Sequence, residues 1–269
     1  MDMSFYTAAV GAHQQQRRLD VHANNLANVN NYGFKSRRPS FSVLMTKQMR
    51  GIEEEEPLLR GAGSRLESAE PNFAQNAFWG TGRAFDYAIE GRGFFALMNP
   101  TTGEFTYTRD GSFVLMRIDT TETPAVPENP ENPDEELNPE DMEPVNVTRW
   151  YLSDGLGNYV LNDNGRPIEV ESPYEQTNQV GDPLPVGIFD FINYNGMTDG
   201  NGTNGFTPVD KNGQVMLGSG KLVQGYLELS NTDYAYEMTR VIESQRSFQY
   251  MIRMIQTSDE ITTTVNGLR

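Results

Sequence analysis

The two histidines, His13 and His22, are the side chains best suited to acid-base or metal chemistry near neutral pH. They lie nine residues apart in a stretch that we expect to be helical, so they project about 180° apart around the helix axis. One metal ion therefore cannot bind both, and the absence of cysteine removes the usual zinc ligand sets. We expect both histidines to lie on the helix surface.

Glycine-rich and acidic segments also lack the features of a known site. Gly91-Arg92-Gly93 lacks the third glycine of a dinucleotide-binding motif, and a P-loop beginning at Gly213 would need lysine where Ser219 stands. Residues 199–205 have oxygen-bearing side chains at alternate positions, as calcium loops do, but lack the bidentate glutamate. No pattern pairs two carboxylates for acid and base roles. The sequence predicts no enzyme activity, catalytic residue, cofactor or metal.

Five asparagines within eight residues form an unusual polar cluster, which Gly33 follows: Asn24, Asn25, Asn28, Asn30 and Asn31. One interpretation is helix termination, because asparagine competes for backbone hydrogen bonds and glycine readily ends a helix in the left-handed conformation. The other is that the amides inside the helix, Asn24 and Asn25, bond across to a neighbouring helix. The sequence leaves both interpretations open.

The segment that carries this cluster is predicted to be one long helix. From Ser4 to about Asn28 there is no proline, and apolar residues recur every three or four positions, which is typical of a helix packed on other helices. The positions that recur every seven residues are Phe5, Ala12, Leu19 and Leu26. Alanine and glutamine fill many positions between them, so we expect other helices to supply burial.

The other end of the chain has the same character. From Asp233 to about Val265 there is neither proline nor glycine, and Ser230 to Asp233 resembles a capping box. Residues spaced by three and four form the apolar stripe: Met238, Val241, Gln245, Phe248, Ile252 and Ile255. After Ile255 the stripe changes phase, as at a stutter. At about 1.5 Å per residue the two helices would be roughly 37 and 50 Å long, so we expect them to pair in a coiled-coil-like layer.

The middle of the chain indicates β structure. Residues 90–117 and 147–229 contain short aromatic runs separated by Asp-Gly and Asn-Gly pairs, which favour tight hairpin turns. These pairs begin at Asp110, Asp154, Asn164, Asn195 and Asn212. Residues 119–144 interrupt the pattern with ten acidic residues, six prolines and no lysine or arginine. Such a stretch cannot fold alone, so we expect an acidic insert in an antiparallel β domain.

Charge and composition exclude several classes of partner. The 269 residues include 37 acidic and 21 basic side chains, a net charge of −16, which argues against binding to nucleic acid or anionic membranes. No apolar run approaches the roughly 18 residues of a membrane span, and the first residues do not resemble a Sec signal peptide. The chain has no cysteine, which fits both reducing and oxidising compartments.

Four ordered blocks of sequence closely resemble the signatures of flagellar basal-body rod and hook proteins. The N-terminal block ends in Gly33-Phe34-Lys35, with Asn31-Tyr32 departing from the small polar pair of the family. The others are EGRGFF at 90–95, YTRDGSF at 107–113, and the segment 227–257 that begins LELSNTD and ends IQT. In size, the chain resembles a proximal or distal rod protein more than the longer hook protein.

The resemblance implies a structural subunit of the flagellar rod. Such subunits leave the cytoplasm through the flagellar type III export apparatus without a cleaved signal, and reach the basal body in the periplasm or cell-wall layer. There they would polymerise with themselves, and with other rod and hook proteins, into a hollow helical tube that transmits torque from motor to hook. The terminal helices would line the tube, and the β domain would lie outside.

These observations together predict an α+β fold with four parts. They are an N-terminal axial helix at 1–33, an extended connection at 34–89, a β domain at 90–229 and a C-terminal axial helix at 230–269. The residues expected to form the assembly interface are Phe5, Leu19, Asn24, Asn25, Leu26, Asn28, Met238, Val241, Gln245, Phe248, Ile252 and Ile255. Two alternatives are a secreted adhesin, with recognition in loops 119–144 and 195–205, and a carboxylate-based hydrolase. Neither explains the matched terminal helices.

Overall fold

A computed structural model describes residues 3–44, 46–49, 58–61, 63–122, 145–170, 183–200 and 204–268. The chain divides into two compact units. Unit 1 comprises residues 1–76 and 229–269, and unit 2 comprises residues 77–228. Both ends of the chain therefore belong to one unit.

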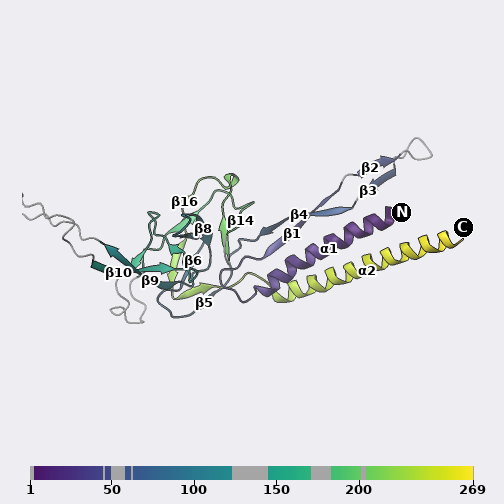
Figure 1. Cartoon of the computed structure of the whole chain (residues 1–269). Helices are drawn as coiled ribbons and strands as arrows, with labels where there is room; N and C mark the ends of the chain where they lie inside the picture. Colours follow the sequence, from purple (N-terminus) through teal and green to yellow (C-terminus); the bar gives the residue numbers. More distant parts are fainter. Residues whose placement is uncertain are drawn as a thin grey trace, which may run out of the picture. The chain divides into compact units, whose positions relative to one another are not determined.

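Unit 1 contains the two long helices expected at the ends of the chain. Helix α1 (Met3–Ala27) and helix α2 (Tyr234–Gly267) lie side by side and antiparallel (Figure 1). Gly11 allows close approach, because a Cβ atom there would lie 3.3 Å from the sulfur of Met251. Helix α2 begins at a carboxylate cap, since the Asp233 side chain accepts hydrogen bonds from the backbone nitrogens of Ala235 and Tyr236. The cap is thus the last residue of the expected capping segment.

A two-stranded ribbon completes unit 1. Strand β1 (Arg37–Val43) pairs antiparallel with β4 (Ser64–Pro71), with a register shift between Ser40 and Phe41. Farther along, β2 (Thr46–Met49) pairs with β3 (Leu58–Gly61), and Leu44 N donates to Gly63 O between the two ladders. A hydrogen bond links the ribbon to α1, because the side-chain oxygen of Gln14 accepts from Leu66 N at 2.6 Å.

Unit 2 is antiparallel β structure, as expected. Its main sheet follows the order β12-β10-β11-β7-β8-β15-β14, with β9 on β10, β13 on β7 and β16 on β13. The strands of this sheet are β7 (Phe94–Met98), β8 (Phe105–Thr108), β9 (Val114–Glu122), β10 (Val145–Ser153), β11 (Tyr159–Val160), β12 (Glu169–Val170), β13 (Ile188–Asp190), β14 (Thr198–Asp199), β15 (Gly205–Thr207) and β16 (Met216–Leu217). Two short ladders pair β6 (Tyr87–Glu90) with β17 (Lys221–Gln224) and β5 (Phe78–Gly80) with β18 (Tyr226–Glu228).

The acidic stretch interrupts one long hairpin of this sheet. Strands β9 and β10 pair over nine positions, from Val114 opposite Ser153 to Glu122 opposite Val145. Residues 119–122 of the stretch therefore belong to β9, and residues 123–144 lie outside the described residues.

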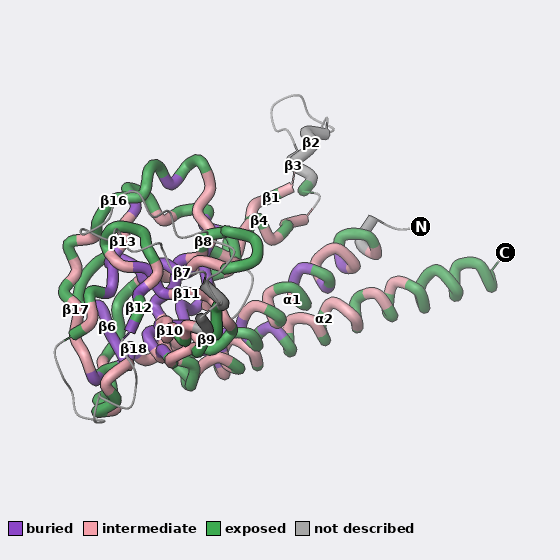
Figure 2. Tube along the Cα trace, turned by 60° about the vertical axis from the view of Figure 1, so that its left-hand side comes forward, coloured by how far each residue is buried: buried purple, intermediate pink, exposed green. Residues whose placement is uncertain are grey.

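The apolar core lies in unit 2. Phe95 packs edge-on against Phe113, with ring centroids 5.1 Å apart, among buried aliphatic side chains. In the described part of unit 1, by contrast, the buried hydrophobic residues are Ala8, Ala12 and Phe34. Figure 2 shows this difference, with buried residues frequent among the strands of unit 2 and sparse along α1 and α2. Within one chain, the described part of unit 1 therefore fully buries few apolar side chains.

The predicted turns are confirmed in part. Gly155 and Gly165 have φ angles of +78° and +72° and lie in turns next to β11, as expected for Asp-Gly and Asn-Gly hairpins. The prediction of a hairpin turn at Asp110-Gly111 is wrong. A Cβ atom at Gly111 would lie 1.7 Å from the backbone oxygen of Tyr87, so the glycine is required for close backbone packing.

Candidate functional site

A buried polar cluster joins the two helices of unit 1. His22 Nδ1 lies 2.6 Å from Glu237 Oε2, and the two side chains are only 5% and 7% exposed. The prediction that His22 lies on the helix surface is wrong, whereas His13 is exposed. A buried imidazole is tolerated here because a carboxylate from α2 meets it. The pair is 215 residues apart in sequence, so helical periodicity alone could not reveal it.

Asn25 extends the cluster to the strand ribbon. Its side-chain nitrogen donates to Glu237 Oε1 at 3.0 Å and to the backbone oxygen of Arg37 at 2.8 Å. Its side-chain oxygen accepts from Arg37 N at 2.8 Å. The amide thus pairs with the backbone of the first residue of β1 much as a neighbouring strand would. One fully buried side chain connects α1, α2 and β1.

The two interpretations of the asparagine cluster apply to different members. Asn25 bonds across to α2, whereas exposed Asn24 accepts from the side chain of Asn28 in the same segment, at 2.6 Å. Gly33 has a φ angle of +66°, so it is left-handed as expected, but it lies six residues beyond Ala27, where α1 ends, and does not cap the helix. Adjacent asparagines therefore have a cross-helix role and a local role.

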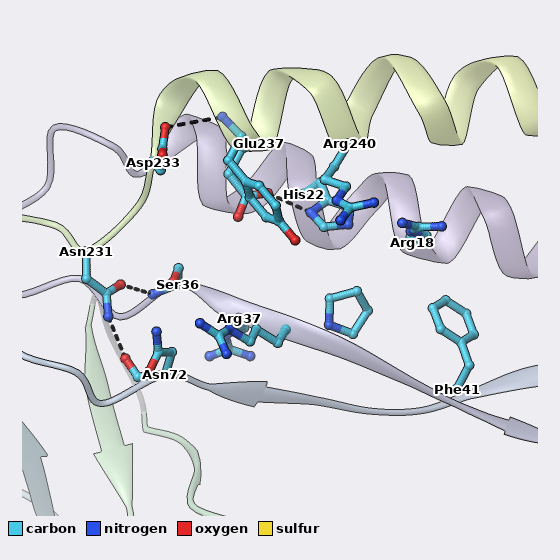
Figure 3. Close-up of a pocket in the computed structure, with 13 residues that line it drawn as sticks. Arg18, His22, Ser36, Arg37, Phe41, Asn72, Asn231, Asp233, Glu237 and Arg240 are labelled. Atoms are coloured by element: carbon cyan, nitrogen blue, oxygen red, sulfur yellow. Dashed lines mark hydrogen bonds and ion pairs between the residues drawn. The ribbon is translucent and has the colours of Figure 1, made fainter.

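A second set of amides ties the segment before α2 to both sides of the ribbon. Asn231 Oδ1 accepts from Ser36 N at 2.7 Å, and Asn231 Nδ2 donates to Asn72 O at 2.6 Å (Figure 3). Asn76 Nδ2 donates to Ser230 O at 2.6 Å. These contacts of Glu237, Asn231 and Asn72 could not be predicted from the sequence, because their partners are remote in sequence. The cross-helix interpretation of the asparagines was the one signal that pointed to such contacts.

These groups surround a cavity of about 710 Å³ between the helices and β1. Four arginines line it, together with Asp233 and Glu237: Arg18, Arg37, Arg38 and Arg240 (Figure 3). Burial lowers the pKa of the Arg37 guanidinium from its usual value. The Tyr236 hydroxyl, together with Glu243, raises the pKa of Arg240. The cavity is therefore a candidate site for anionic groups.

The apolar residues predicted to form the assembly interface are only partly covered within one chain. Half-buried side chains on the two helices are Phe5, Leu19, Leu26, Met238, Val241, Phe248, Ile252 and Ile255. Of the polar candidates, Asn24 and Gln245 are exposed, Asn28 is half-buried and Asn25 is buried. Their role in assembly stays a prediction.

The last turns of α2 carry uncovered apolar side chains. All residues from Asp259 to Leu268 are exposed. Ile261 and Val265 are 58% and 57% exposed, and Leu268 is 83% exposed. In the sequence, these three residues continue the apolar stripe after its change of phase beyond Ile255. They leave an apolar surface at the end of the helix that α1 does not cover.

The described ranges show neither a metal-binding cluster nor a membrane-spanning helix. No group of three histidine, aspartate or glutamate side chains there is placed to hold a metal ion. In the calcium-like segment, residues 201–203 lie outside the described residues. No described helix combines the length and apolarity that crossing a bilayer requires.

Comparison with known protein families gives matches at three places along the chain. Residues 5–35 match the model for flagella basal body rod proteins, residues 88–122 match the D1 domain of the flagellar hook protein FlgE/F/G, and residues 223–268 match the C-terminal region of flagellar basal body rod FlgEFG proteins. The first of these matches covers α1 from Phe5 onward, and the last contains all of α2.

Full-length relatives agree with these matches. The flagellar basal-body rod protein FlgG of Borreliella burgdorferi is 31% identical over all of this chain and 99% of its own length. FlgG of Bacillus subtilis is 30% identical, covering 99% of this chain and 98% of its own. The flagellar hook-basal body complex protein FlhP of B. subtilis is 26% identical, covering 99% of each chain. The adhesin alternative finds no support, and the chain belongs to the flagellar basal-body rod protein family.

Proposed function

We propose that this chain, a structural member of the flagellar basal-body rod family, polymerises into a hollow axial tube that transmits torque from motor to hook. Its partners are further copies of itself, neighbouring rod and hook proteins, and the flagellar export apparatus that delivers it. It acts beyond the cytoplasmic membrane, in the periplasm or cell-wall layer. Four sequence blocks that resemble the signatures of the family and full-length similarity to FlgG proteins support this proposal.

The thin apolar burial of unit 1 is the observation that carries the proposal. Its long helices contribute Ala8 and Ala12 as buried hydrophobic residues, while larger side chains on the same helices are half-buried and Ile261 and Val265 are exposed. Helices gain most of their stability from packing an apolar face, and exposed apolar patches of this kind mark interaction sites. Neighbouring subunits would supply the missing burial.

In this proposal the helices form a coiled-coil-like inner layer. Residues 1–33 and 230–269 make up the axial core, 34–89 connect it to the β domain, and 90–229 form that domain. The proposed interface includes the half-buried residues of both helices, exposed Asn24 and Gln245, and half-buried Asn28. Buried Asn25 contributes by fixing the geometry of the subunit.

Electron microscopy of polymers grown from the purified full-length chain tests this function. We expect hollow tubes, with the terminal helices around the channel. The double variant Ile261→Ser/Val265→Ser should form no tubes at wild-type concentrations, because both side chains are exposed in the monomer and would be buried between subunits. The matched control is Ile192→Ser/Leu217→Ser, which alters two residues of unit 2 that are somewhat more exposed (71% and 65%). A wild-type chain that stays monomeric, or normal tubes from the helix variant, would contradict the proposal.

A further inference from the structure

Helix α2 has a second apolar face, opposite its half-buried stripe. Ile261 lies nine residues after half-buried Ile252, which places the two side chains about 180° apart around the helix axis. The residues that share the face of Ile261 are all exposed: Tyr250, Met254, Ile261, Val265 and Leu268. A helix that is apolar on two opposite faces is typical of packing between two partners, and α1 covers only one of these faces.

The end of α2 also extends past the start of α1. The two helices are antiparallel, and Gly11 of α1 faces Met251 of α2. Met3 lies eight residues before Gly11, so it is level with Asp259, eight residues after Met251. Figure 1 shows α2 continuing beyond this point. The apolar side chains from Ile261 onward therefore have no described part of α1 beside them.

A second uncovered apolar surface lies on strand β1. Exposed and half-buried residues alternate along β1, and the register shift after Ser40 places two exposed residues in succession, Ser40 and Phe41. Phe41 is 38% exposed and Val43 is 76% exposed. Apart from Tyr6 and residues of α2, they are the exposed large hydrophobic residues in the described part of unit 1. We call exposed Arg38, Phe41 and Val43 the β1 ledge.

The end of α2 cannot cover the β1 ledge of its own chain. Val43 is level with the part of α1 that faces Met251, because the ribbon next to Val43 approaches Val10 at Gly63. Val265 lies fourteen residues beyond Met251, which is roughly 21 Å along a continuous helix. A contact between these two surfaces therefore requires a second copy.

Charges beside the two surfaces are complementary. Exposed Glu260 directly precedes Ile261 at the edge of the apolar stripe, and exposed Arg38 lies at one end of the β1 ledge. Arg38 is across the ladder from Glu70, yet no ion pair joins these two residues in the described structure. Further guanidinium groups line the cavity that Arg38 and Phe41 border. A carboxylate that approaches the β1 ledge would therefore form charge-assisted contacts.

We propose that the exposed stripe at the end of α2 in one copy packs on the β1 ledge of the next copy, with Glu260 beside Arg38. The inference rests on the proposed self-assembly and names the surface that covers the end of the helix. Donor and acceptor are different surfaces, so the contact is heterologous and repeats without closing on a pair, as a helical filament requires. With parallel copies, it displaces each neighbour by roughly 21 Å along the helix axis.

Disulfide trapping tests the contact directly, because the chain has no native cysteine. The full-length variant Val43→Cys/Val265→Cys is polymerised and then oxidised. We expect a ladder of dimers, trimers and longer species on denaturing gels, since every copy donates one cysteine and accepts another. Chains that carry only one of the two substitutions should give dimers when mixed and none when oxidised alone. Dimers from Val265→Cys alone would overturn the proposal in favour of contact between two α2 helices.

Control pairs test the other surfaces that could cover the stripe. Tyr6→Cys/Val265→Cys places the acceptor on α1, and Leu217→Cys/Val265→Cys places it on an exposed apolar residue of unit 2. We expect no ladder from either, and a ladder there but not with Val43→Cys would overturn the proposal. Polymers that form normally without the Val43–Val265 cross-link would refute the contact and leave the proposed function intact. Failure of the wild-type chain to polymerise would refute the proposed function, and this inference with it.

Charge reversal provides an independent measurement, which also decides the question if the cysteine variants fail to polymerise. Glu260→Arg and Arg38→Glu should each raise the critical concentration for polymerisation roughly tenfold at low salt, and less at 1 M salt, because like charges would then meet. The double variant should restore it to within about threefold of wild type. The matched control Glu260→Arg/Arg65→Glu has the same net charge and changes another exposed arginine of the ribbon. No rescue by Arg38→Glu, or equal rescue by Arg65→Glu, would refute the specific contact.

Discussion

Replacement of Asn25 by alanine should loosen the junction of α1, α2 and β1 without affecting unit 2. The substitution removes three hydrogen bonds at once, two with the backbone of Arg37 and one with Glu237 Oε1. Asn25 is fully buried, so its truncation leaves these three groups short of a partner. The buried pair of His22 and Glu237 would keep its own 2.6 Å contact.

The expected loss follows from those three bonds. A typical intramolecular hydrogen bond contributes about 1 kcal/mol net, and a buried group left without a partner costs about 1–3 kcal/mol. The Arg37 contacts are only part-buried, so water can replace some of what is lost, and about 1 kcal/mol per bond is the appropriate value. The total of about 3 kcal/mol corresponds to a roughly 100-fold change in the local opening equilibrium, at 1.4 kcal/mol per factor of ten.

Hydrogen exchange on the dilute full-length chain measures this opening. The amide of Arg37 and those in the first turn of α2 should exchange about 100-fold faster in Asn25→Ala than in Asn24→Ala. Asn24 is the matched control because it lies in the same helix but is exposed and bonds locally to Asn28. Both substitutions gain the same helix propensity, about 0.7 kcal/mol or less, so the comparison cancels that contribution. The amide of Leu97, in the sheet of unit 2, is the internal reference, because its exchange rate should be the same in both variants.

Equal exchange in the two variants would refute the reasoning. It would mean either that the Asn25 contacts carry no free energy or that the junction is already open in the dissociated chain. Faster amide exchange at Leu97 as well would mean that Asn25 contributes to the global stability of the molecule, contrary to the division into two units.

Three further outcomes follow from the distribution of burial and charge. Phe248→Asp should abolish polymers yet leave the melting of unit 2 unchanged, because Phe248 is half-buried on α2 and a charge in an apolar contact costs several kcal/mol. Calorimetry measures the melting and sedimentation measures the polymers, and normal polymers would contradict the prediction. Replacing residues 123–144 by a short Gly/Ser linker should shift the melting temperature of unit 2 by no more than a few degrees, since β9 and β10 keep their ladder, and a collapse of the sheet would disprove it. Limited proteolysis of the dilute chain should remove the exposed 259–268 end first and the rest of unit 1 next; peptide mapping that shows unit 2 cut first would reverse the predicted order of stability.

The sequence was sufficient to predict the elements whose signals are local. Both terminal helices were predicted from three-four spacing, and the predicted span of α1 from Ser4 to about Asn28 differs from Met3–Ala27 by about one residue at each end. The antiparallel strands were predicted from aromatic runs and turn pairs in the same way. The exception at Gly111 is instructive, because the glycine is needed for contact with Tyr87, which lies outside any local turn pattern.

The candidate site could not be predicted because its partners are remote in sequence. Asn25 and Glu237 are 212 residues apart, and the contacts of Asn231 with Ser36 and Asn72 are also remote in sequence. A histidine in a helical pattern is usually exposed, and only the facing carboxylate of Glu237 makes the burial of His22 acceptable. The cavity arginines come from α1, β1 and α2, so no single window of sequence shows them together.

The polar junction and the uncovered helix faces have one physical explanation. In the proposed assembly, the large apolar side chains on the helices of unit 1 are needed between copies and so cannot all be buried within one chain. It can still fix the angle between α1, α2 and β1 with hydrogen bonds, which are directional and require little apolar area. Asn25 and Glu237 serve that purpose, while residues such as Phe248 and Ile252 stay half-buried. We therefore infer that unit 1 obtains its geometry within the chain and most of its apolar stabilisation from its neighbours.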